Sequence, residues 1–346
     1  MSRSSRKLEH IRYALENQSM NIGDFDQVQF VHQSISQVSL EDINLETVIG
    51  GLKLGSPIII NAMTGGAMET TKINQKLAVV ARETGVAIAV GSQMAAIKDS
   101  TLRRSYQIVR QENPKGVVFA NLGSEALPSH ALAAIEMIDA NALQIHVNTI
   151  QELVMPEGDR NFKGMLERIQ EIKEAIEIPL IVKEVGFGFS KESAAQLKDI
   201  GVKLIDVGGK GGTNFAYIEN RRREKPLEFF NQWGNSTPIS ILEVKAVSGI
   251  DIIASGGIRD SLQAAKALGI GANAVGIAGK ILEKIVHQNE KEAMDYLVEI
   301  HEELRYIFTA LGAVNILELQ KKPYVLSADI LNWCHQRGLI LKNSLQ

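Results

Sequence analysis

Short apolar runs alternate with helical stretches over most of this chain. From residue 57 onward, eight apolar runs each end in small or polar residues. The segments between them carry apolar residues at the spacing of an amphipathic helix, which predicts helices over 74–84, 125–140, 163–177, 191–200 and 261–268. The predicted strands are 57–66, 87–93, 117–123, 142–148, 179–186, 203–209, 251–257 and 274–279.

This rhythm predicts an α/β fold. Strands that alternate with helices pair in parallel through right-handed crossovers. Eight such units favour closure into a (β/α)₈ TIM barrel, which takes about 250 residues. A doubly wound open sheet is the alternative. We expect a single domain over 1–346, with an N-terminal arm (1–56), a barrel core (about 57–285) and a C-terminal helical extension (about 286–346).

The run at 142–148 has two different faces. Gln144, His146 and Asn148 alternate with Ile145 and Val147, so the three polar side chains share one face of the strand. Because the neighbouring runs are apolar, we place this polar face inside a pocket. Gln151 and Glu152 follow just beyond the strand. In a barrel, the carboxyl ends of the strands carry the chemistry. The candidate catalytic residues are His146, Asn148 and Gln151.

Composition narrows the classes of function. The chain has 346 residues, of which 45% are hydrophobic, and a formal net charge of -3. This weak negative charge argues against nucleic acid as a partner. Its one cysteine, Cys334, allows no intrachain disulfide, which suits a reducing cytoplasm. We expect no signal peptide, because no apolar core follows the first basic residues, and no membrane span.

Two glycine-rich motifs follow consecutive strands late in the chain. Residues 255–259 read Ser-Gly-Gly-Ile-Arg, and residues 276–280 read Gly-Ile-Ala-Gly-Lys. Glycines let backbone N–H groups approach an anion, and the helix that begins there adds its positive dipole end. This pair of turns, after strands seven and eight, is the usual phosphate site of a barrel. A third glycine-rich stretch, 206–213, is either another approach to the ligand or a lid hinge.

Polar side chains also end the other strands. They predict a flat, hydrogen-bonding ligand lying across the barrel mouth. A phosphate with a flat heterocycle indicates flavin mononucleotide (FMN), and no GxGxxG motif follows a strand to indicate a dinucleotide domain. Each residue alone could equally be a satisfied core polar residue. These side chains are Thr64, Ser92, Gln93, Asn121 and Lys183.

Several features have two interpretations. Glu152 is either a surface or capping residue or a ligand for Mg²⁺, which takes one or two protein carboxylates together with water and substrate phosphate. The basic stretch 6–12 is either a solvated tail or an arm over an anionic ligand. Insertions at 155–162 and 213–237 are candidate lids, although the charge run 221–225 is more often a solvated loop.

Taken together, the motifs resemble those of the type 2, flavin-dependent isopentenyl-diphosphate isomerases. The resemblance covers nearly the whole chain, and its order and spacing carry the specificity. It implies a barrel that binds FMN and Mg²⁺, a homo-oligomer (tetramer or octamer), and a flavin reduced by NAD(P)H. The implied reaction interconverts isopentenyl and dimethylallyl diphosphate. The motifs include Arg6-Lys7-x-x-His10, Met63-Thr64-Gly65-Gly66, Gly91-Ser92-Gln93, His146-x-Asn148-x-x-Gln151-Glu152, Gly211-Gly212-Thr213 and Ser255–Arg259.

The resemblance also assigns expected roles. Glu152 would bind Mg²⁺. The substrate would contact Arg6, Lys7, His10, Ser92, Gln93, Met94, His146, Asn148 and Gln151. FMN would contact Ala62, Met63, Thr64, Ser92, Asn121, Lys183, Gly208, Thr213, Gly256, Gly257, Ile258, Arg259, Ala278 and Gly279.

Two positions depart from the family pattern. Many members have a basic residue at Met94 and a serine at Gly208. The diphosphate would then depend more on Arg6, Lys7 and His146, and one hydrogen bond to the flavin phosphate would be missing or supplied by backbone.

Three other classes of protein are alternatives to this isomerase family. A flavin-dependent 2-hydroxyacid oxidase needs a histidine between strands six and seven, and 210–249 contains none. An IMP dehydrogenase-like barrel needs a nucleophilic cysteine in a barrel loop, and Cys334 lies far outside. A flavin-binding protein without catalysis is the third.

Overall fold

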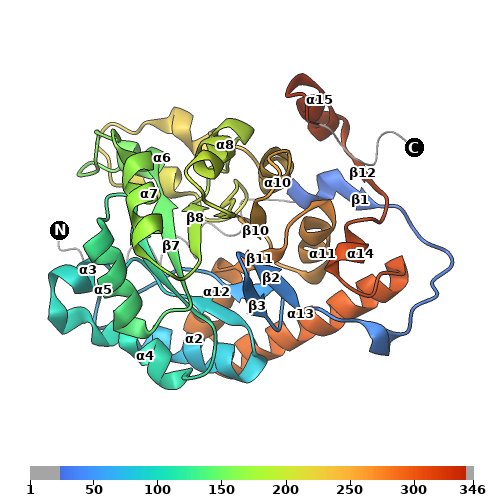
Figure 1. The fold of residues 1–346 in the computed structure, drawn as a ribbon, viewed down its shortest axis with the longest axis horizontal. Helices are drawn as coiled ribbons and strands as arrows, with labels where there is room; N and C mark the ends of the chain where they lie inside the picture. Colours follow the sequence, from blue (N-terminus) through green and yellow to red (C-terminus); the bar gives the residue numbers. More distant parts are fainter. Residues whose placement is uncertain (1–23, 340–346) are drawn as a thin grey trace.

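The computed structural model describes residues 24–339 and contains a closed barrel of eight parallel strands (Figure 1). The barrel closes where Val275 of the last strand pairs with Ile58 of the first, which excludes the open-sheet alternative. The strands are β4 (Ile58–Ile60), β5 (Ala87–Ala89), β6 (Val118–Gly123), β7 (Ala142–Val147), β8 (Leu180–Glu184), β9 (Leu204–Asp206), β10 (Asp251–Ser255) and β11 (Ala274–Ile277).

All eight predicted runs are confirmed as strands. Most runs extend beyond the strand they contain because their last small and polar residues form the turns at the barrel mouth. In β4 every residue is buried, as expected for a parallel strand covered on both faces. The polar face of β7 lies inside the barrel, where the Gln144 side chain bonds those of Asn121 and Asn61.

Helices surround the barrel and follow their strands (Figure 1). Each bears local signals for its ends. Pro128 stands at the first position of its helix, where a missing N–H costs nothing, and Gly85 ends another at φ 69°. The main barrel helices are α2 (Thr70–Thr84), α4 (Arg104–Glu112), α5 (Pro128–Ile138), α7 (Met165–Ala175), α8 (Lys191–Asp199), α10 (Thr237–Lys245), α11 (Ser261–Ile270) and α12 (Gly279–His287).

A short hairpin, β2 (Thr47–Ile49) and β3 (Leu52–Leu54), packs against the inside of the barrel. Ile49 and Leu54 join a separate apolar cluster with residues such as Ile59 and Phe119. Part of the predicted N-terminal arm is therefore core-forming, and polar chemistry is left to the opposite, carboxyl end of the strands.

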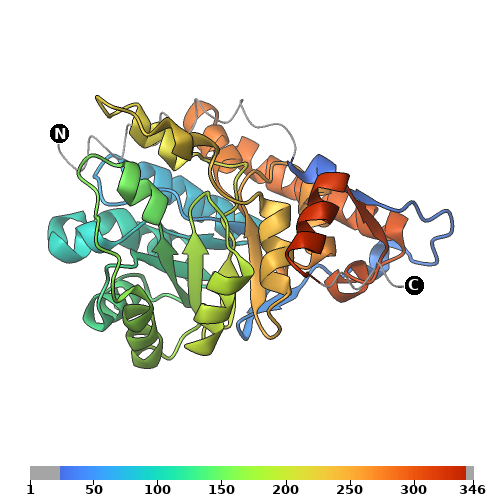
Figure 2. The same ribbon diagram turned by 90° about the horizontal axis from the view of Figure 1, so that it is seen from above.

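The two ends of the described chain meet beside the barrel (Figure 2). Strand β1 (Val28–Phe30) pairs antiparallel with β12 (Tyr324–Leu326). The expectation of helices alone beyond residue 285 was therefore incomplete, because β12 is too short to show a strand pattern. The remaining elements there are α13 (Glu290–Leu311), α14 (Ile316–Leu319) and α15 (Ala328–Gln336).

A buried carboxylate docks α15 on the barrel. Glu243 of α10 accepts hydrogen bonds from Trp333 Nε1 at 2.8 Å and Arg337 Nε at 2.9 Å. Burial by itself would raise the pKa of Glu243. The hydrogen bonds that the carboxylate accepts from Arg337, the Lys191 backbone and Trp333 outweigh this effect and lower the pKa. The extension is thus joined to the core by a specific polar contact.

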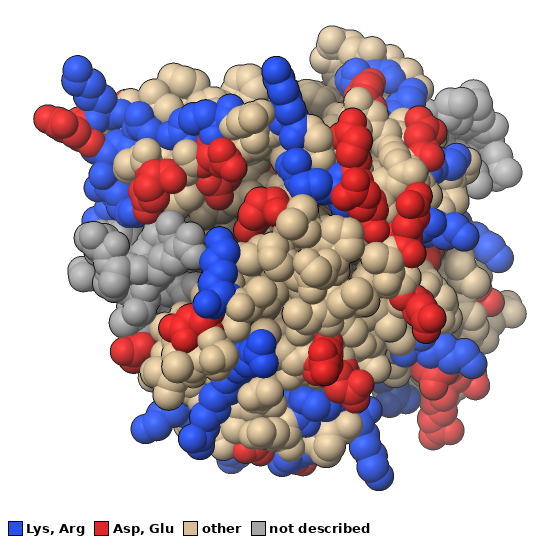
Figure 3. Space-filling view, turned by 60° about the vertical axis from the view of Figure 1, so that its left-hand side comes forward, with Lys and Arg blue, Asp and Glu red and all other residues tan. Residues whose placement is uncertain are grey.

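Within residues 24–339, no helix combines the length and apolar character that a bilayer span requires. On the face shown in Figure 3, basic and acidic side chains are interspersed and form no continuous basic surface.

Candidate functional site

A cavity of about 300 Å³ opens at the carboxyl ends of the barrel strands. Every residue expected to contact flavin lines it, and so do His146 and Gln151. Other lining residues, including Asn61 and Phe215, were not singled out from the sequence. The structure therefore brings the predicted flavin residues together around one space, while their individual roles stay predictions.

Glycine backbone forms one side of this cavity, at the ends of β9, β10 and β11. Gly209 N donates to the Ser255 carbonyl at 2.8 Å, and Thr237 Oγ1 donates to the Gly256 carbonyl at 2.6 Å. Gly256 has φ 107°, and a Cβ there would overlap the Gly209 carbonyl. The two turns pack this closely only because no side chain intervenes.

Positive charge accompanies these turns. Arg259 follows the Gly256–Gly257 turn, and α12 begins at Gly279 with Lys280 in its first turn. A helix N-terminus offers unpaired N–H groups and its positive dipole end to an anion. Arg259 Nη2 also donates to the Gly211 carbonyl at 3.3 Å, which ties this corner to the turn after β9. The arrangement fits the phosphate group of FMN.

Across the cavity, the end of β4 offers an unused polar atom. Thr64 Oγ1 is buried and has no hydrogen-bond partner among the described residues. Buried hydroxyls in proteins are normally paired, so this one is available to bond a ligand in the cavity. The polar edge of a flavin ring would provide the partner.

A buried ion pair lies at the base of the cavity. Lys183 Nζ is 3.1 Å from Asp206 Oδ2, and Asp206 has no exposed surface. Asn61 Nδ2 donates to the same oxygen at 2.7 Å, while Ser255 Oγ and Gly208 N donate to Oδ1. Because the carboxylate is saturated with donors, its charge is compensated and Lys183 is held beneath the cavity.

His146 is joined to this ion pair by amide side chains. His146 Nδ1 lies 2.8 Å from Asn121 Oδ1, and Asn121 Nδ2 donates to Gln144 Oε1 at 3.0 Å. Gln144 Nε2 then donates to Asn61 Oδ1 at 3.2 Å. Burial lowers the pKa of His146, and this exceeds the opposite effect of Glu125, so the neutral imidazole is favoured.

Two residues expected to contact substrate lie behind the cavity wall. Gln93 has no exposed surface. Its Oε1 accepts a hydrogen bond from the Asn121 N–H at 3.0 Å, and its Nε2 donates to the Ala134 carbonyl at 2.9 Å. Met94 is 6% exposed and packs in the main core. In this structure both residues hold the wall in place and neither lines the cavity.

Asn148 and Glu152 lie beside the cavity on α6 (Thr149–Val154) and its N-cap. Asn148 Nδ2 donates to Glu152 Oε1 at 2.9 Å, and Asp159 N donates to Oε2 at 2.8 Å. No group of three or more His, Cys, Asp or Glu side chains that could hold a metal occurs within residues 24–339. Glu152 fits Mg²⁺ only as a single, oriented carboxylate, with the remaining ligands coming from substrate and water.

The two predicted insertions are tied to each other. Arg222 pairs with Glu157 at 2.6 Å, and Arg223 Nη1 donates to the Val154 carbonyl at 2.8 Å. Arg222 and Arg223 therefore connect the two insertions, and the charge run at 221–225 is not merely a solvated loop. The second insertion also folds into α9 (Phe215–Asn220) and a 3₁₀ turn, η5 (Glu228–Gln232).

The departure at Gly208 has a structural reason. Gly208 has φ 44°, and a Cβ there would overlap the Glu184 carbonyl. A serine would therefore require a different backbone at this turn. The Gly208 N–H donates a hydrogen bond to Asp206 Oδ1 at 3.2 Å, so this glycine helps to position the buried carboxylate.

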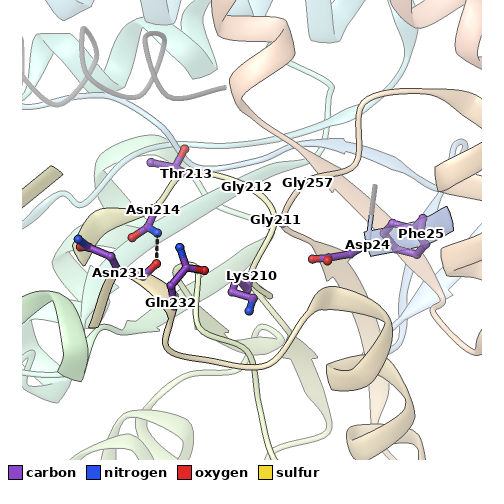
Figure 4. A pocket seen from close by; sticks show the side chains of 12 residues that line it. Asp24, Phe25, Lys210, Gly211, Gly212, Thr213, Asn214, Asn231, Gln232 and Gly257 are labelled. Carbon is purple, nitrogen blue, oxygen red and sulfur yellow. Dashed lines mark hydrogen bonds between the residues drawn. The ribbon is translucent and has the colours of Figure 1, made fainter. Parts of the chain in front are cut away.

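A second, polar cavity of about 200 Å³ shares Gly212 and Thr213 with the first. Figure 4 shows the side chains that line this second cavity. Lys210, Asn231 and Gln232 line it, and Asp24 faces it from the opposite side. Burial raises the pKa of Asp24, while Lys210 acts in the other direction. Asn214 Nδ2 donates to the Asn231 carbonyl at 2.8 Å and fixes the rim. Arg6, Lys7 and His10 lie outside the described residues.

Comparison with known proteins agrees with this geometry. The model of the FMN-dependent dehydrogenase family matches residues 127–326. An isopentenyl-diphosphate delta-isomerase of Bacillus cytotoxicus is 53% identical over 345 residues, covering 98% of both chains. Another, from a Geobacillus species, is 49% identical over 344 residues and covers 99% of both.

Solved structures resemble the fold at low sequence identity. A lactate oxidase of Pediococcus acidilactici is 15% identical, with a TM-score of 0.69 over 92% of this chain and 90% of that one. A mandelate oxidase variant with benzaldehyde is 14% identical, with a TM-score of 0.64 over 93% and 98%. These two show the barrel alone. The full-length relatives and the family match show more: this chain belongs to the isopentenyl-diphosphate delta-isomerases, within the FMN-dependent dehydrogenase family.

Proposed function

We propose that this protein interconverts isopentenyl diphosphate and dimethylallyl diphosphate, with reduced FMN and Mg²⁺ as cofactors. The observation that carries the proposal is the cavity itself, in which a glycine-lined anion site and a set of polar side chains face each other. The near-full-length similarity to named isomerases supports the substrate class.

FMN would be held by the chain at two places. Its phosphate would bind at the turns 256–259 and 278–279, and its ring would lie near Thr64, Asn121 and Lys183, all of which line the cavity. When bound and reduced, the flavin supplies acid–base chemistry for moving the alkene protons. Lys183 is oriented from below by Asp206, and its positive charge would stabilise an electron-rich ring.

The substrate would lie over the ring, between β7 and α6. Gln151 and His146 both line the cavity. Gln151 would orient the alkene, and His146 would contact the diphosphate. Asn148 holds Glu152 through its 2.9 Å hydrogen bond, and the oriented Glu152 carboxylate would bind Mg²⁺. A bound Mg²⁺ would supply positive charge against the diphosphate, and a substrate fixed in this way would meet a smaller entropic barrier.

Further features belong to the same proposal. NAD(P)H would reduce the flavin before turnover, Arg6, Lys7 and His10 would approach the diphosphate, and Ser92 would contact both ligands. We further propose a cytoplasmic homo-oligomer, a tetramer or octamer, that acts in isoprenoid synthesis without nucleic acid or membrane partners.

The direct test uses purified protein loaded with FMN, reduced with NADPH, and supplied with Mg²⁺ and isopentenyl diphosphate. Formation of dimethylallyl diphosphate is expected. Oxygen consumption with a 2-hydroxyacid would support the oxidase instead, and a yellow protein inert to both would be a flavin binder. A colourless protein that refuses FMN would overturn the proposal.

Gln151→Ala tests the positioning of the alkene. We expect flavin binding to persist and turnover to fall by about 100-fold, because a misplaced reactant loses much of the benefit of orientation. Gln170→Ala, on the exposed face of α7, is the matched control and should leave turnover unchanged. Unchanged turnover in Gln151→Ala would remove this residue from the mechanism.

A further inference from the structure

The side chains beneath the cavity form one continuous chain of hydrogen bonds between Asp206 and His146. We propose that Asp206 is a positioning residue that fixes the tautomer of His146 through the amide chain, defined here as Asn61, Gln144 and Asn121. The neutral imidazole then carries its proton on Nδ1, and Nε2 is the nitrogen left for a ligand. The tautomer follows from the chain's own contacts, and only its use by a diphosphate rests on the proposed function.

The direction of the amide chain is set at its Asp206 end. Asp206 pairs with the Lys183 ammonium group, so its carboxylate oxygens accept hydrogen bonds and donate none. Asn61 must therefore turn its NH₂ group toward Asp206, at 2.7 Å. The backbone independently supports this orientation, because the Ala62 N–H donates to Asn61 Oδ1 at 2.9 Å.

Each following amide then has only one consistent orientation. Asn61 Oδ1 accepts from Gln144 Nε2 at 3.2 Å, which leaves Gln144 Oε1 to accept from Asn121 Nδ2 at 3.0 Å. The same logic leaves Asn121 Oδ1 facing His146. Gln144 has no exposed surface, and Asn61 and Asn121 are 2% and 3% exposed. Water therefore has little access to these amides. A flipped amide would lose two buried hydrogen bonds that water could not replace.

The final contact selects the tautomer. Asn121 Oδ1 cannot donate, so the 2.8 Å contact with His146 Nδ1 requires the proton on Nδ1. The donors all point toward Asp206, from His146 through three amides to the buried carboxylate. Aligned hydrogen bonds polarise one another, so the charge of Asp206 reinforces the arrangement.

This arrangement has a chemical consequence for the ligand. Nε2 of a neutral ring offers a lone pair, which would repel an anionic diphosphate oxygen. If a proton is taken up at Nε2, the Nδ1 hydrogen bond stays intact and the same ring becomes a charge-assisted donor. Glu125 favours that imidazolium form, as does the Leu122 carbonyl, while Lys183 and burial oppose it. His146 is thus prepared to gain its proton together with the ligand.

The tautomer can be measured directly on the full-length protein loaded with FMN. Histidine is labelled with ¹⁵N in the ring, and ring nitrogen shifts are recorded by magic-angle-spinning NMR at pH 7.5. The His146 signals are assigned by their loss in His146→Gln. We expect a protonated Nδ1 and a bare Nε2. A protonated Nε2, or a doubly protonated ring, in the unmutated protein overturns the proposal without any further variant.

Three variants test whether the amide chain is the cause. Asn61→Leu and Gln144→Met each break it, and we expect loss of the pure Nδ1–H signal in favour of a mixture of tautomers. Gln144→Glu loses the hydrogen bond to Asn61 Oδ1 but still presents an acceptor to Asn121, so it should retain Nδ1–H. The matched control is Asn74→Leu, which removes another buried amide, one that donates to the Ser105 carbonyl at 2.6 Å and is not part of the amide chain.

The outcomes separate a specific role from a general structural one. A pure Nδ1–H signal in both Asn61→Leu and Gln144→Met would show that the chain does not set the tautomer. A mixture in Asn74→Leu would show that any buried amide has the same effect, which also refutes the proposal. No readout here depends on isomerase activity, so failure of the proposed function leaves the result interpretable.

Discussion

The two sides of the cavity are built on opposite physical principles. On the side formed by β9, β10 and β11, glycine backbones approach each other because side chains are absent. On the side formed by β4, β6, β7 and β8, polar side chains fill the barrel interior and bond one another and Asp206 at the end of β9. The structure of the first side requires that its glycines carry no Cβ atom. The structure of the second side requires that its buried polar side chains have hydrogen-bond partners.

This difference determines how each side fails. A glycine turn is damaged by adding one methyl group, and the damage is local strain. The polar side is damaged by removing one partner, because the remaining group is left buried and unpaired. We therefore expect the larger losses of stability on the polar side and more direct losses of flavin binding on the glycine side.

The largest effect is expected for Lys183→Met. This change leaves Asp206 charged and fully buried without its cation, which should lower the free energy of unfolding by about 3 to 5 kcal/mol. Lys280→Met removes a lysine that pairs with Glu283 at 3.0 Å but is 35% exposed, and should cost about 1 kcal/mol or less. Chemical denaturation of both variants makes the comparison. Equal losses would mean that burial of the pair does not matter.

The next effect is a pH dependence at the end of β8. Glu184 Oε2 accepts four backbone N–H groups, from Val185 to Gly188, yet burial raises its pKa to about 7. The folded protein then holds this proton more tightly than the unfolded chain. Stability from this group is complete below about pH 4.5 and declines by about 3 kcal/mol as pH rises to 7.

Glu184→Gln should remove that decline, because an amide cannot ionise but still offers an oxygen to the same N–H groups. The measurement is the unfolding free energy at several pH values between 4.5 and 7.5. Glu243→Gln is the matched control, since the pKa of Glu243 is lowered and its contribution is lost only at more acidic pH. An unchanged slope in Glu184→Gln would assign the pH dependence to other groups.

A smaller effect on stability, with a direct effect on the ligand, is expected for Gly256→Ala. Its φ of 107° strains any other residue and the new methyl group meets the Gly209 carbonyl, so we expect a loss of about 2 kcal/mol. FMN affinity, measured by quenching of flavin fluorescence, should fall at least about tenfold, because the change alters the glycine turn at the proposed phosphate site. Gly55→Ala, where nothing lies within 4 Å of the added carbon, should behave as the unmutated protein does.

The glycine side was predictable from sequence because its signals are local. Ser255 to Arg259 are consecutive, and the turn, the small residues and the helix start are all contained in one stretch. The apolar runs likewise predicted each barrel strand. Short strands such as β1 and β12 carry too few residues to show a pattern, and they escaped prediction.

The polar side was predictable only in part. The alternation along β7 correctly places Gln144 and His146 on an inward face, but it does not say what they meet. Asn61 and Asp206 lie 145 positions apart, and only the closed barrel brings them together. The one available signal was a polar residue at the end of an otherwise apolar strand. For the same reason the Arg222–Glu157 pair, 65 positions apart, could not be anticipated.

The pairing of β1 with β12 also has a consequence for synthesis of the chain. Val28 leaves the ribosome about 300 residues before its partner Leu326. At translation rates of about 5 to 20 residues per second, this strand edge waits roughly 15 to 60 seconds for the segment that covers it. During that interval the nascent chain exposes unsatisfied backbone groups that invite association with neighbouring chains. Chaperone demand should therefore be greatest late in translation, when the barrel is nearly complete but its ends are still apart.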